Sequence, residues 1–186
     1  MYGPEQPFAG LYTLDRAHRT RFDGRMIENR VVTAQAEVAA PADVIFELIA
    51  DPARQPEWDG NDNLGHADEG QRVRAVGDDF VMVNANGKVR KNHVREFAEG
   101  RLIAWQPGPV DQPSPGHLWR WELEPIDGQH TLVRHTYDWA ALTDERRLER
   151  ARSTTSSNLM ASIQRLKELS EQASGDRPRG AGTLPA

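Results

Sequence analysis

The stretch AEVAAPADVIFELIADPARQPEWDG, residues 36–60, decides how the fold opens. Leading into it, polar and apolar residues alternate over 27–39, which predicts a strand with one buried face. Pro41 suits the first turn of a helix, where its missing N–H costs nothing. The apolar residues that follow keep helical spacing: Val44, Ile45, Leu48 and Ile49. Asp51-Pro52 ends this helix, because the residue before a proline disfavours the α region, and PARQPEW predicts a second short helix or turn.

Downstream, the pattern changes to a meander and then to a helix. Residues 63–139 form short period-2 runs separated by turn signals such as Asn86-Gly87 and Asp127-Gly128, which predicts antiparallel hairpins. Residues 144–172 carry one apolar stripe opposite a charged face, which predicts a long amphipathic helix. The stripe consists of Leu148, Ala151, Thr155, Leu159, Ile163, Leu166 and Leu169.

This order of elements resembles the helix-grip fold of the SRPBCC (START-like) superfamily, and its polyketide cyclase/dehydrase-like branch in particular. The resemblance is carried by residues 36–60, by EFAEGRLIAW at 96–105, by TLVRHTYDW at 131–139 and by IQRLKELSE at 163–171. It implies an α+β protein in which a curved antiparallel sheet of about six or seven strands wraps around the long C-terminal helix, with two short helices after the first strand. The superfamily includes lipid carriers, aromatase/cyclases, hormone receptors and dioxygenase domains, so the resemblance does not fix the function.

The two ends differ from the middle of the chain. Residues 1–25 lack helical or strand periodicity, so we expect an N-terminal arm or extension, with a start codon misassigned upstream of Met26 as the alternative. Residues 26–172 form the expected SRPBCC/START-like domain. Residues 173–186 are rich in Gly and Pro and predict a disordered C-terminal tail.

Composition limits the function classes. A net charge of −5 argues against a nucleic-acid partner, because binding to phosphates needs a basic face. No run of about 18–20 apolar residues is present to span a membrane, and the N-terminus lacks the layout of a secretion signal, so we expect a cytoplasmic protein. The absence of cysteine excludes disulfides and thiolate sites. The six histidines show no metal-ligand spacing, and nucleotide-binding and Ser-hydrolase motifs are missing, so we expect no metal and no cofactor.

The strand alternation also predicts which side chains face a pocket. If Asn86-Gly87 form a two-residue type I′ turn, Phe80 and Met82 share the inward face with Lys91, His93 and Arg95. Polar groups on an apolar face are costly unless they are paired or wet, so His93 and Arg95 become candidate ligand contacts. The alternative is that the two cations extend to water at the sheet margin.

Two later strands bring aromatic groups to the same face. In HLWRWELE, period-2 alternation turns Trp119 and Trp121 inward, and in TLVRHTYDW it turns His135 and Tyr137 inward, together with Val133 and Trp139. The tryptophans either line a pocket or fill a solid core, and Trp58 is expected to be structural.

The resulting ligand-binding candidates are Phe80, Met82, His93, Arg95, Trp119, Trp121, His135 and Tyr137. This mixture suits an apolar or aromatic small-molecule ligand with one or two polar groups, lipid or polyketide-like, bound by a carrier or sensor. The first alternative is an aromatase/cyclase-type enzyme with His93, His135 or Tyr137 as acid or base, and the second is a protein-interaction domain. The sequence leaves catalysis, the ligand's identity and the oligomeric state open, a homodimer included.

Overall fold

The computed structural model describes residues 19–22 and 25–175, and these fall into two compact units that divide between Arg30 and Val31. The first unit contains an antiparallel hairpin of β1 (Arg19–Phe22) and β2 (Arg25–Glu28). The N-terminal arm or extension expected over 1–25 stays a prediction, and β1 lies within it. The dipeptide Asp23-Gly24, between the two strands in the sequence, is typical of hairpins. The rest of the predicted arm, 1–18, lies outside the described residues.

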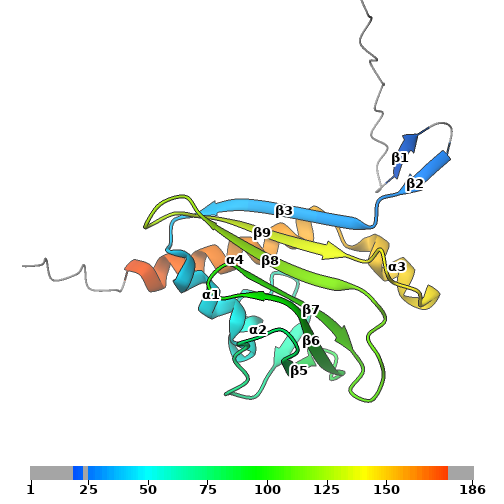
Figure 1. Ribbon diagram of the computed structural model, residues 1–186, viewed down its shortest axis with the longest axis horizontal. Helices are drawn as coiled ribbons and strands as arrows, with labels where there is room; N and C mark the ends of the chain where they lie inside the picture. Colours follow the sequence, from blue (N-terminus) through cyan, green and yellow to red (C-terminus); the bar gives the residue numbers. More distant parts are fainter. Residues whose placement is uncertain (1–18, 23–24, 176–186) are drawn as a thin grey trace, which may run out of the picture. The chain divides into compact units, whose positions relative to one another are not determined.

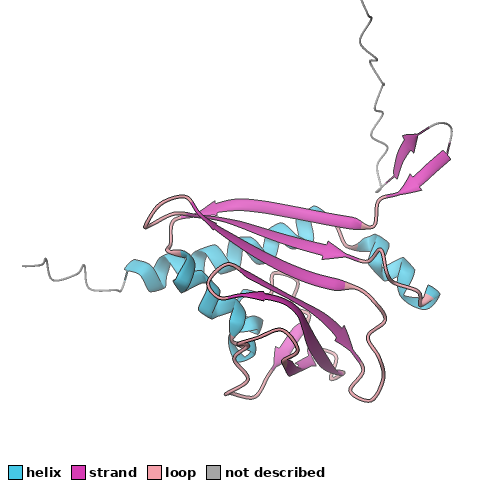
Figure 2. Ribbon diagram, in the orientation of Figure 1, coloured by secondary structure: helices cyan, strands magenta, loops and turns pink. Residues whose placement is uncertain are grey.

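The second unit is an open antiparallel sheet of seven strands packed against helices (Figures 1 and 2). The strand order is β3-β9-β8-β7-β6-β5-β4, so β4 to β9 form a continuous meander and β3 joins its far edge. The strands are β3 (Val31–Val38), β4 (Leu64–His66), β5 (Asp79–Asn84), β6 (Val89–Ala98), β7 (Leu102–Gly108), β8 (Leu118–Pro125) and β9 (Thr131–Asp138). The expected sheet of six or seven antiparallel strands is therefore confirmed.

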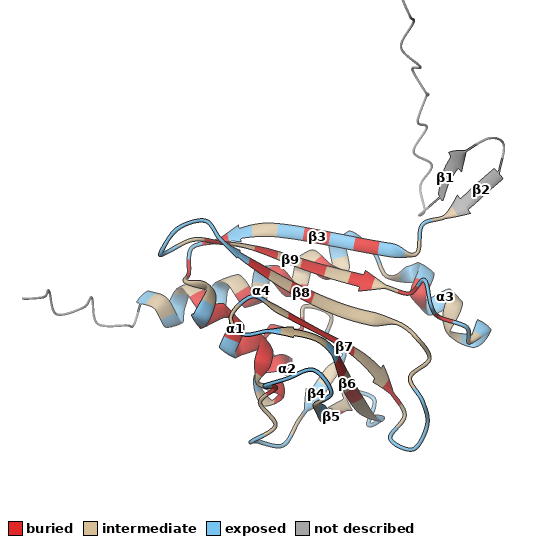
Figure 3. Ribbon diagram, viewed as in Figure 1, coloured by how far each residue is buried: buried red, intermediate tan, exposed pale blue. Residues whose placement is uncertain are grey.

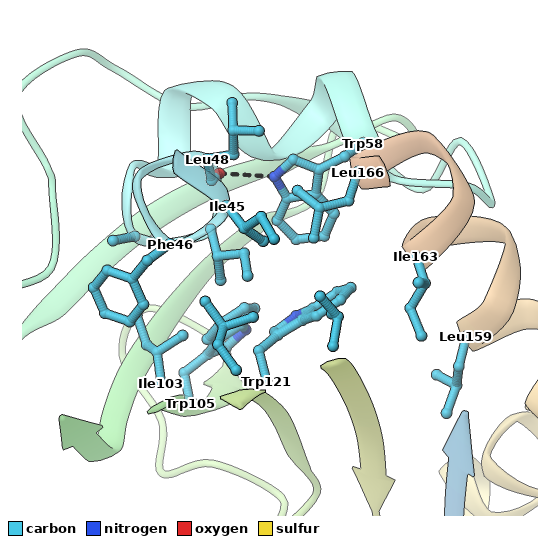
Figure 4. Packing of buried hydrophobic residues seen from close by; sticks show 14 of the residues in the cluster. Ile45, Phe46, Leu48, Trp58, Ile103, Trp105, Trp121, Leu159, Ile163 and Leu166 are labelled. Atoms are coloured by element: carbon cyan, nitrogen blue, oxygen red, sulfur yellow. Dashed lines mark hydrogen bonds between the residues drawn. The ribbon is translucent and has the colours of Figure 1, made fainter. Parts of the chain in front are cut away.

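Short helices connect β3 to the meander, as the sequence predicted. They are α1 (Ala42–Ala50), the 3₁₀ turn η1 (Pro52–Arg54) and α2 (Gln55–Trp58). Trp58 closes this region, because its Nε1 donates a hydrogen bond of 2.8 Å to the carbonyl of Leu48 (Figure 4). Its ring also meets the Trp121 ring edge to face at 5.1 Å between centroids, which ties α2 to the central strand β8.

The C-terminal helix is long but begins later than its apolar stripe suggests. The stripe over 144–172 is divided between α3 (Glu145–Ser153) and α4 (Ser156–Gly175). Thr154 adopts an extended conformation, and Thr155 then caps α4 together with Asn158, whose Oδ1 accepts hydrogen bonds from the backbone N–H and the hydroxyl of Thr155. The local capping interaction therefore outweighs the continuous stripe.

Helix α4 packs on β3 and β9 and against α1 and α2. Its buried residues Leu159, Ile163 and Leu166 face the core, and β3 alternates between buried and exposed positions as predicted (Figure 3). The helix continues through Gly175, so the first residues of the predicted tail, 173–175, are helical. The remainder of that tail, 176–186, lies outside the described residues.

Candidate functional site

A cavity of about 500 Å³ lies between the sheet and the helical layer of the second unit. Strands β4 to β9 contribute to its wall, together with residues of α2, α3, α4 and of several connecting loops. Its size falls within the range typical of sites for small organic molecules.

Two stacked cross-strand pairs from β8 and β9 form the aromatic wall of the cavity. Trp121 lies opposite His135 and stacks on it with ring centroids 3.7 Å apart and planes 11° apart. Trp119 lies opposite Tyr137 and stacks at 4.2 Å. Successive residues of a strand point to opposite faces, so the period-2 alternation correctly predicted that these four side chains point inward. Side chains directly opposite on one face are close neighbours, which explains the stacking.

The position of the cavity shows which tryptophans line it, a question that the sequence left open. Trp121 and Trp139 both belong to the buried core and Trp119 packs against it, but only Trp119 and Trp121 of these three also border the cavity. Trp58 combines both roles, because it borders the cavity and is anchored by the hydrogen bond to Leu48.

Of the eight predicted contacts, five border the cavity and three do not. The five are Met82, Trp119, Trp121, His135 and Tyr137. Phe80 faces inward but packs edge to face on Trp105 at 5.6 Å, as part of the core. His93 and Arg95 lie on the outer face of the sheet, where His93 Nδ1 is 2.8 Å from a carboxylate oxygen of Asp79 and Arg95 is exposed.

His93 and Arg95 were predicted on the wrong face of the sheet because the register of the β5-β6 hairpin was wrong. The predicted two-residue turn set Met82 opposite Lys91, but in the structure Met82 lies opposite Arg90. Gly87 has a φ of +76° and donates a 2.8 Å hydrogen bond to the carbonyl of Asn84. The loop therefore has three residues, with Gly87 in the left-handed position that follows the turn. A shift of one residue moves every side chain of a strand to the other face.

The corrected register brings in residues that the sequence interpretation missed. Arg90 and Asn92 occupy the inward positions opposite Met82 and Phe80, which had been assigned to Lys91 and His93. His117 also borders the cavity, and because it precedes Trp119 by two residues, the same alternation could have identified it. Arg147 and Arg150 reach the cavity from α3, although the sequence placed them on the charged face opposite the apolar stripe of 144–172.

Burial keeps the two imidazoles and the phenol of the wall neutral at neutral pH. Burial lowers the pKa of His135 to about 3, and a backbone hydrogen bond at Leu159 acts weakly against it. Burial, followed by the charges of Arg147, Arg150 and Arg90, lowers the pKa of His117 to about 4. Burial raises the pKa of Tyr137 to about 12. At neutral pH the wall therefore presents two neutral imidazoles and a protonated phenol.

Three buried polar atoms of this wall have no hydrogen-bond partner in the described part of the chain. They are Nε1 of Trp121, Nδ1 of His117 and Nδ1 of His135. Buried polar groups are almost always satisfied, since leaving one unpaired costs about 1–3 kcal/mol. A bound molecule with a hydrogen-bond acceptor could satisfy the Trp121 indole, which is only a donor.

Asp59 is the carboxylate of the cavity wall, and its role is structural. It accepts backbone hydrogen bonds from Asn61, Asn63 and Leu64 at 3.2, 2.6 and 2.8 Å. These bonds hold the loop after α2 in place beneath α4. Within residues 19–22 and 25–175, no group of three His, Asp or Glu side chains is arranged to hold a metal ion. None of the helices described in the structure could cross a membrane by its length and hydropathy.

Comparisons with known proteins identify relatives of the chain. Two proteins of Mycobacterium tuberculosis described as uncharacterized, Rv0088 and MT0096, are 32% and 31% identical to it over 112 residues. The match covers 59% of this chain and 48% of each relative, so the chain spans about half the length of the curated relatives it matches.

Solved structures with the same fold include protein MLL2253 of Mesorhizobium loti, with a TM-score of 0.58 and 17% identity over 77% of this chain and 98% of that one. A START superfamily protein of Mycobacterium smegmatis has a TM-score of 0.53 and 17% identity over 77% and 98% of the two chains. The di-domain aromatase/cyclase StfQ of the steffimycin biosynthetic pathway has a TM-score of 0.53 and 20% identity, covering 78% of this chain and 46% of its own. At these identities the likeness shows the fold alone.

The family assignment rests on a match along most of the chain. The family model described as polyketide cyclase/dehydrase and lipid transport matches residues 29–171, from the end of β2 to the last turns of α4. This match confirms the resemblance seen at residues 36–60 and 163–171. The chain belongs to the polyketide cyclase/dehydrase and lipid transport family.

Proposed function

We propose that this protein binds a hydrophobic or aromatic small molecule in the cavity beneath α4 and acts as its carrier or sensor. The observation that carries the proposal is the wall of stacked aromatic pairs, Trp121 on His135 and Trp119 on Tyr137, around a volume of about 500 Å³. Flat rings favour a planar or elongated apolar body, and the unpaired polar atoms of Trp121, His117 and His135 favour one that carries polar groups.

The description of the family supports two activities, and the geometry favours binding over catalysis. A general acid or base works best when its pKa lies near the operating pH. The pKa of His135, about 3, and that of Tyr137, about 12, lie far from neutrality in opposite directions. His93, the third candidate acid or base, lies on the opposite face of the sheet. None of the three groups nominated for the aromatase/cyclase alternative is therefore poised within the cavity for proton transfer at neutral pH.

Fluorescence of the neutral probe N-phenyl-1-naphthylamine tests the proposal. We expect the probe to bind the parent protein with one-site saturation and to quench tryptophan emission. Trp121→Ala should weaken this binding, because it removes one half of a stacked pair. Its cost in unfolding free energy should be close to the roughly 3–5 kcal/mol typical of an aromatic deleted from a filled core, because Trp121 is only 1% exposed.

Phe46→Ala is the matched control. Phe46 is as deeply buried as Trp121 but does not border the cavity, so Phe46→Ala should carry a similar cost in stability and leave probe affinity unchanged once the protein is folded. If the parent protein does not bind the probe, or if the two variants lower the probe affinity equally, the binding proposal is wrong. As a separate measurement, native mass spectrometry of the purified parent protein would identify any ligand that copurifies with it.

A further inference from the structure

The charges that border the cavity are unbalanced in the described part of the chain. Four cationic side chains contribute to the wall, Lys88, Arg90, Arg147 and Arg150, against the single carboxylate of Asp59. That carboxylate already accepts three backbone hydrogen bonds. The excess of positive charge is local, because the chain as a whole carries a net charge of −5.

Two of these arginines have no carboxylate partner among the described residues. Arg90 donates to the carbonyl of its neighbour Val89 at 3.0 Å, and Arg150 reaches the neutral Oδ1 of Asn63 at 3.4 Å. Arg147 differs, since it forms an ion pair with Asp144 at 3.2 Å. Burial, and then the charges of Arg147 and Arg150, lower the pKa of Arg90, as expected for guanidinium groups held near one another without anions between them.

The positive charge is concentrated toward one end of the aromatic wall. The charges of Arg147 and Arg150 act to lower the pKa of both His117 and Tyr137, whose rings meet edge to face at 5.9 Å between centroids. The pKa of His135, which belongs to the next cross-strand pair along β9, is shifted only by burial and by a backbone hydrogen bond at Leu159. The cavity therefore has a cationic end near His117 and an uncharged aromatic end at Trp121 and His135.

From this polarity we infer that the cavity takes an amphipathic organic anion, with a carboxylate or similar oxyanion held by Arg90 and Arg150 and its apolar body against Trp121 and His135. The inference rests on the proposed small-molecule binding and specifies the chemical class of the ligand. A guanidinium group binds a carboxylate through two parallel hydrogen bonds, and an anion would offset the mutual repulsion of the arginines.

A matched pair of probes tests the charge separately from the apolar body. N-phenyl-1-naphthylamine and 8-anilinonaphthalene-1-sulfonate share one aromatic skeleton and differ by the sulfonate. At low salt we expect the sulfonate probe to bind about tenfold more tightly, as one charge-assisted interaction allows, and we expect added salt to reduce that advantage. As a second measurement, 2-naphthoate should displace the neutral probe at about tenfold lower concentration than 2-naphthalenemethanol.

Substitutions of two arginines that border the cavity, and of one arginine on the outer face of β6, complete the test. Arg90→Met and Arg150→Met should each remove most of the anion's advantage while the neutral probe keeps its affinity. Arg95→Met changes the same charge on the same strand but on the exposed outer face, so it should leave both probes unaffected. If the neutral probe binds and the anion is no tighter, or if Arg95→Met matches Arg90→Met, the anion inference is wrong and the binding proposal stands. If neither probe binds, the proposed function itself is refuted.

Discussion

The two buried histidines of the cavity wall should make the protein sensitive to mild acid. An unfolded histidine has a pKa of about 6.5, whereas folding lowers that of His135 to about 3 and that of His117 to about 4. As the pH falls below about 6.5, the unfolded chain takes up protons that the folded protein refuses. Stability is therefore lost as the pH falls, through the window between about 6.5 and the folded values.

The size of the effect follows from these pKa values. Between pH 7 and pH 5, each histidine should remove about 2 kcal/mol from the free energy of unfolding, or about 4 kcal/mol for the pair. That is a large fraction of the 5–15 kcal/mol typical of a folded domain. Carboxyl groups in model peptides have pKa values near 4, below this window, so the window is chosen to report mainly on histidine.

Urea denaturation followed by tryptophan fluorescence at pH 7 and pH 5 measures the loss directly. His135→Phe keeps an aromatic ring against Trp121 but cannot titrate, and His117→Phe does the same beside Tyr137. Each single variant should lose about half of the pH dependence and the double variant nearly all of it, whatever their absolute stabilities. A double variant that still loses about 4 kcal/mol between the two pH values would refute the assignment of the effect to these imidazoles.

Three further outcomes are expected. A Cβ at Gly60 would lie 2.2 Å from the carbonyl carbon of Ala161 in α4, so Gly60→Ala should lower the Tm by many degrees in a thermal scan, whereas Gly128→Ala, with nothing within 4 Å, should leave it unchanged. Asn158→Ala removes the side chain that caps α4 with Thr155 and should cost about 1 kcal/mol in urea denaturation; an unchanged midpoint would contradict the capping role. Deletion of residues 176–186 should leave the Tm nearly unchanged, because that segment offers almost no apolar area to bury, and a drop of several degrees would show that it docks.

Sequence periodicity was sufficient wherever neighbours along the chain carry the information. Alternation over residues 118–125 and 131–138 placed Trp119, Trp121, His135 and Tyr137 on one face, because successive residues of a strand point to opposite sides. The same reasoning identified the strand before Pro41, the helix that ends at Asp51-Pro52 and the apolar stripe of α4. The resemblance at residues 36–60 added the family, which the match over 29–171 confirms.

The register of a hairpin and the partners of a charge depend on contacts that periodicity does not contain. The dipeptide Asn86-Gly87 is compatible with a two-residue or a three-residue loop, and choosing between them decided whether Arg90 or His93 faces the cavity.

Arg147 and Arg150 lie in a run whose alternating charges are typical of a solvated helix. They reach the cavity because Thr154 breaks the helical stripe ahead of α4. The depressed pKa of His135 likewise comes from burial by elements distant in sequence. Local periodicity, together with the resemblance at residues 36–60, was thus enough to predict the fold class and the inward aromatic side chains. The polar end of the cavity could be found only in three dimensions, because burial and the partners of a charge depend on residues brought together from distant parts of the chain.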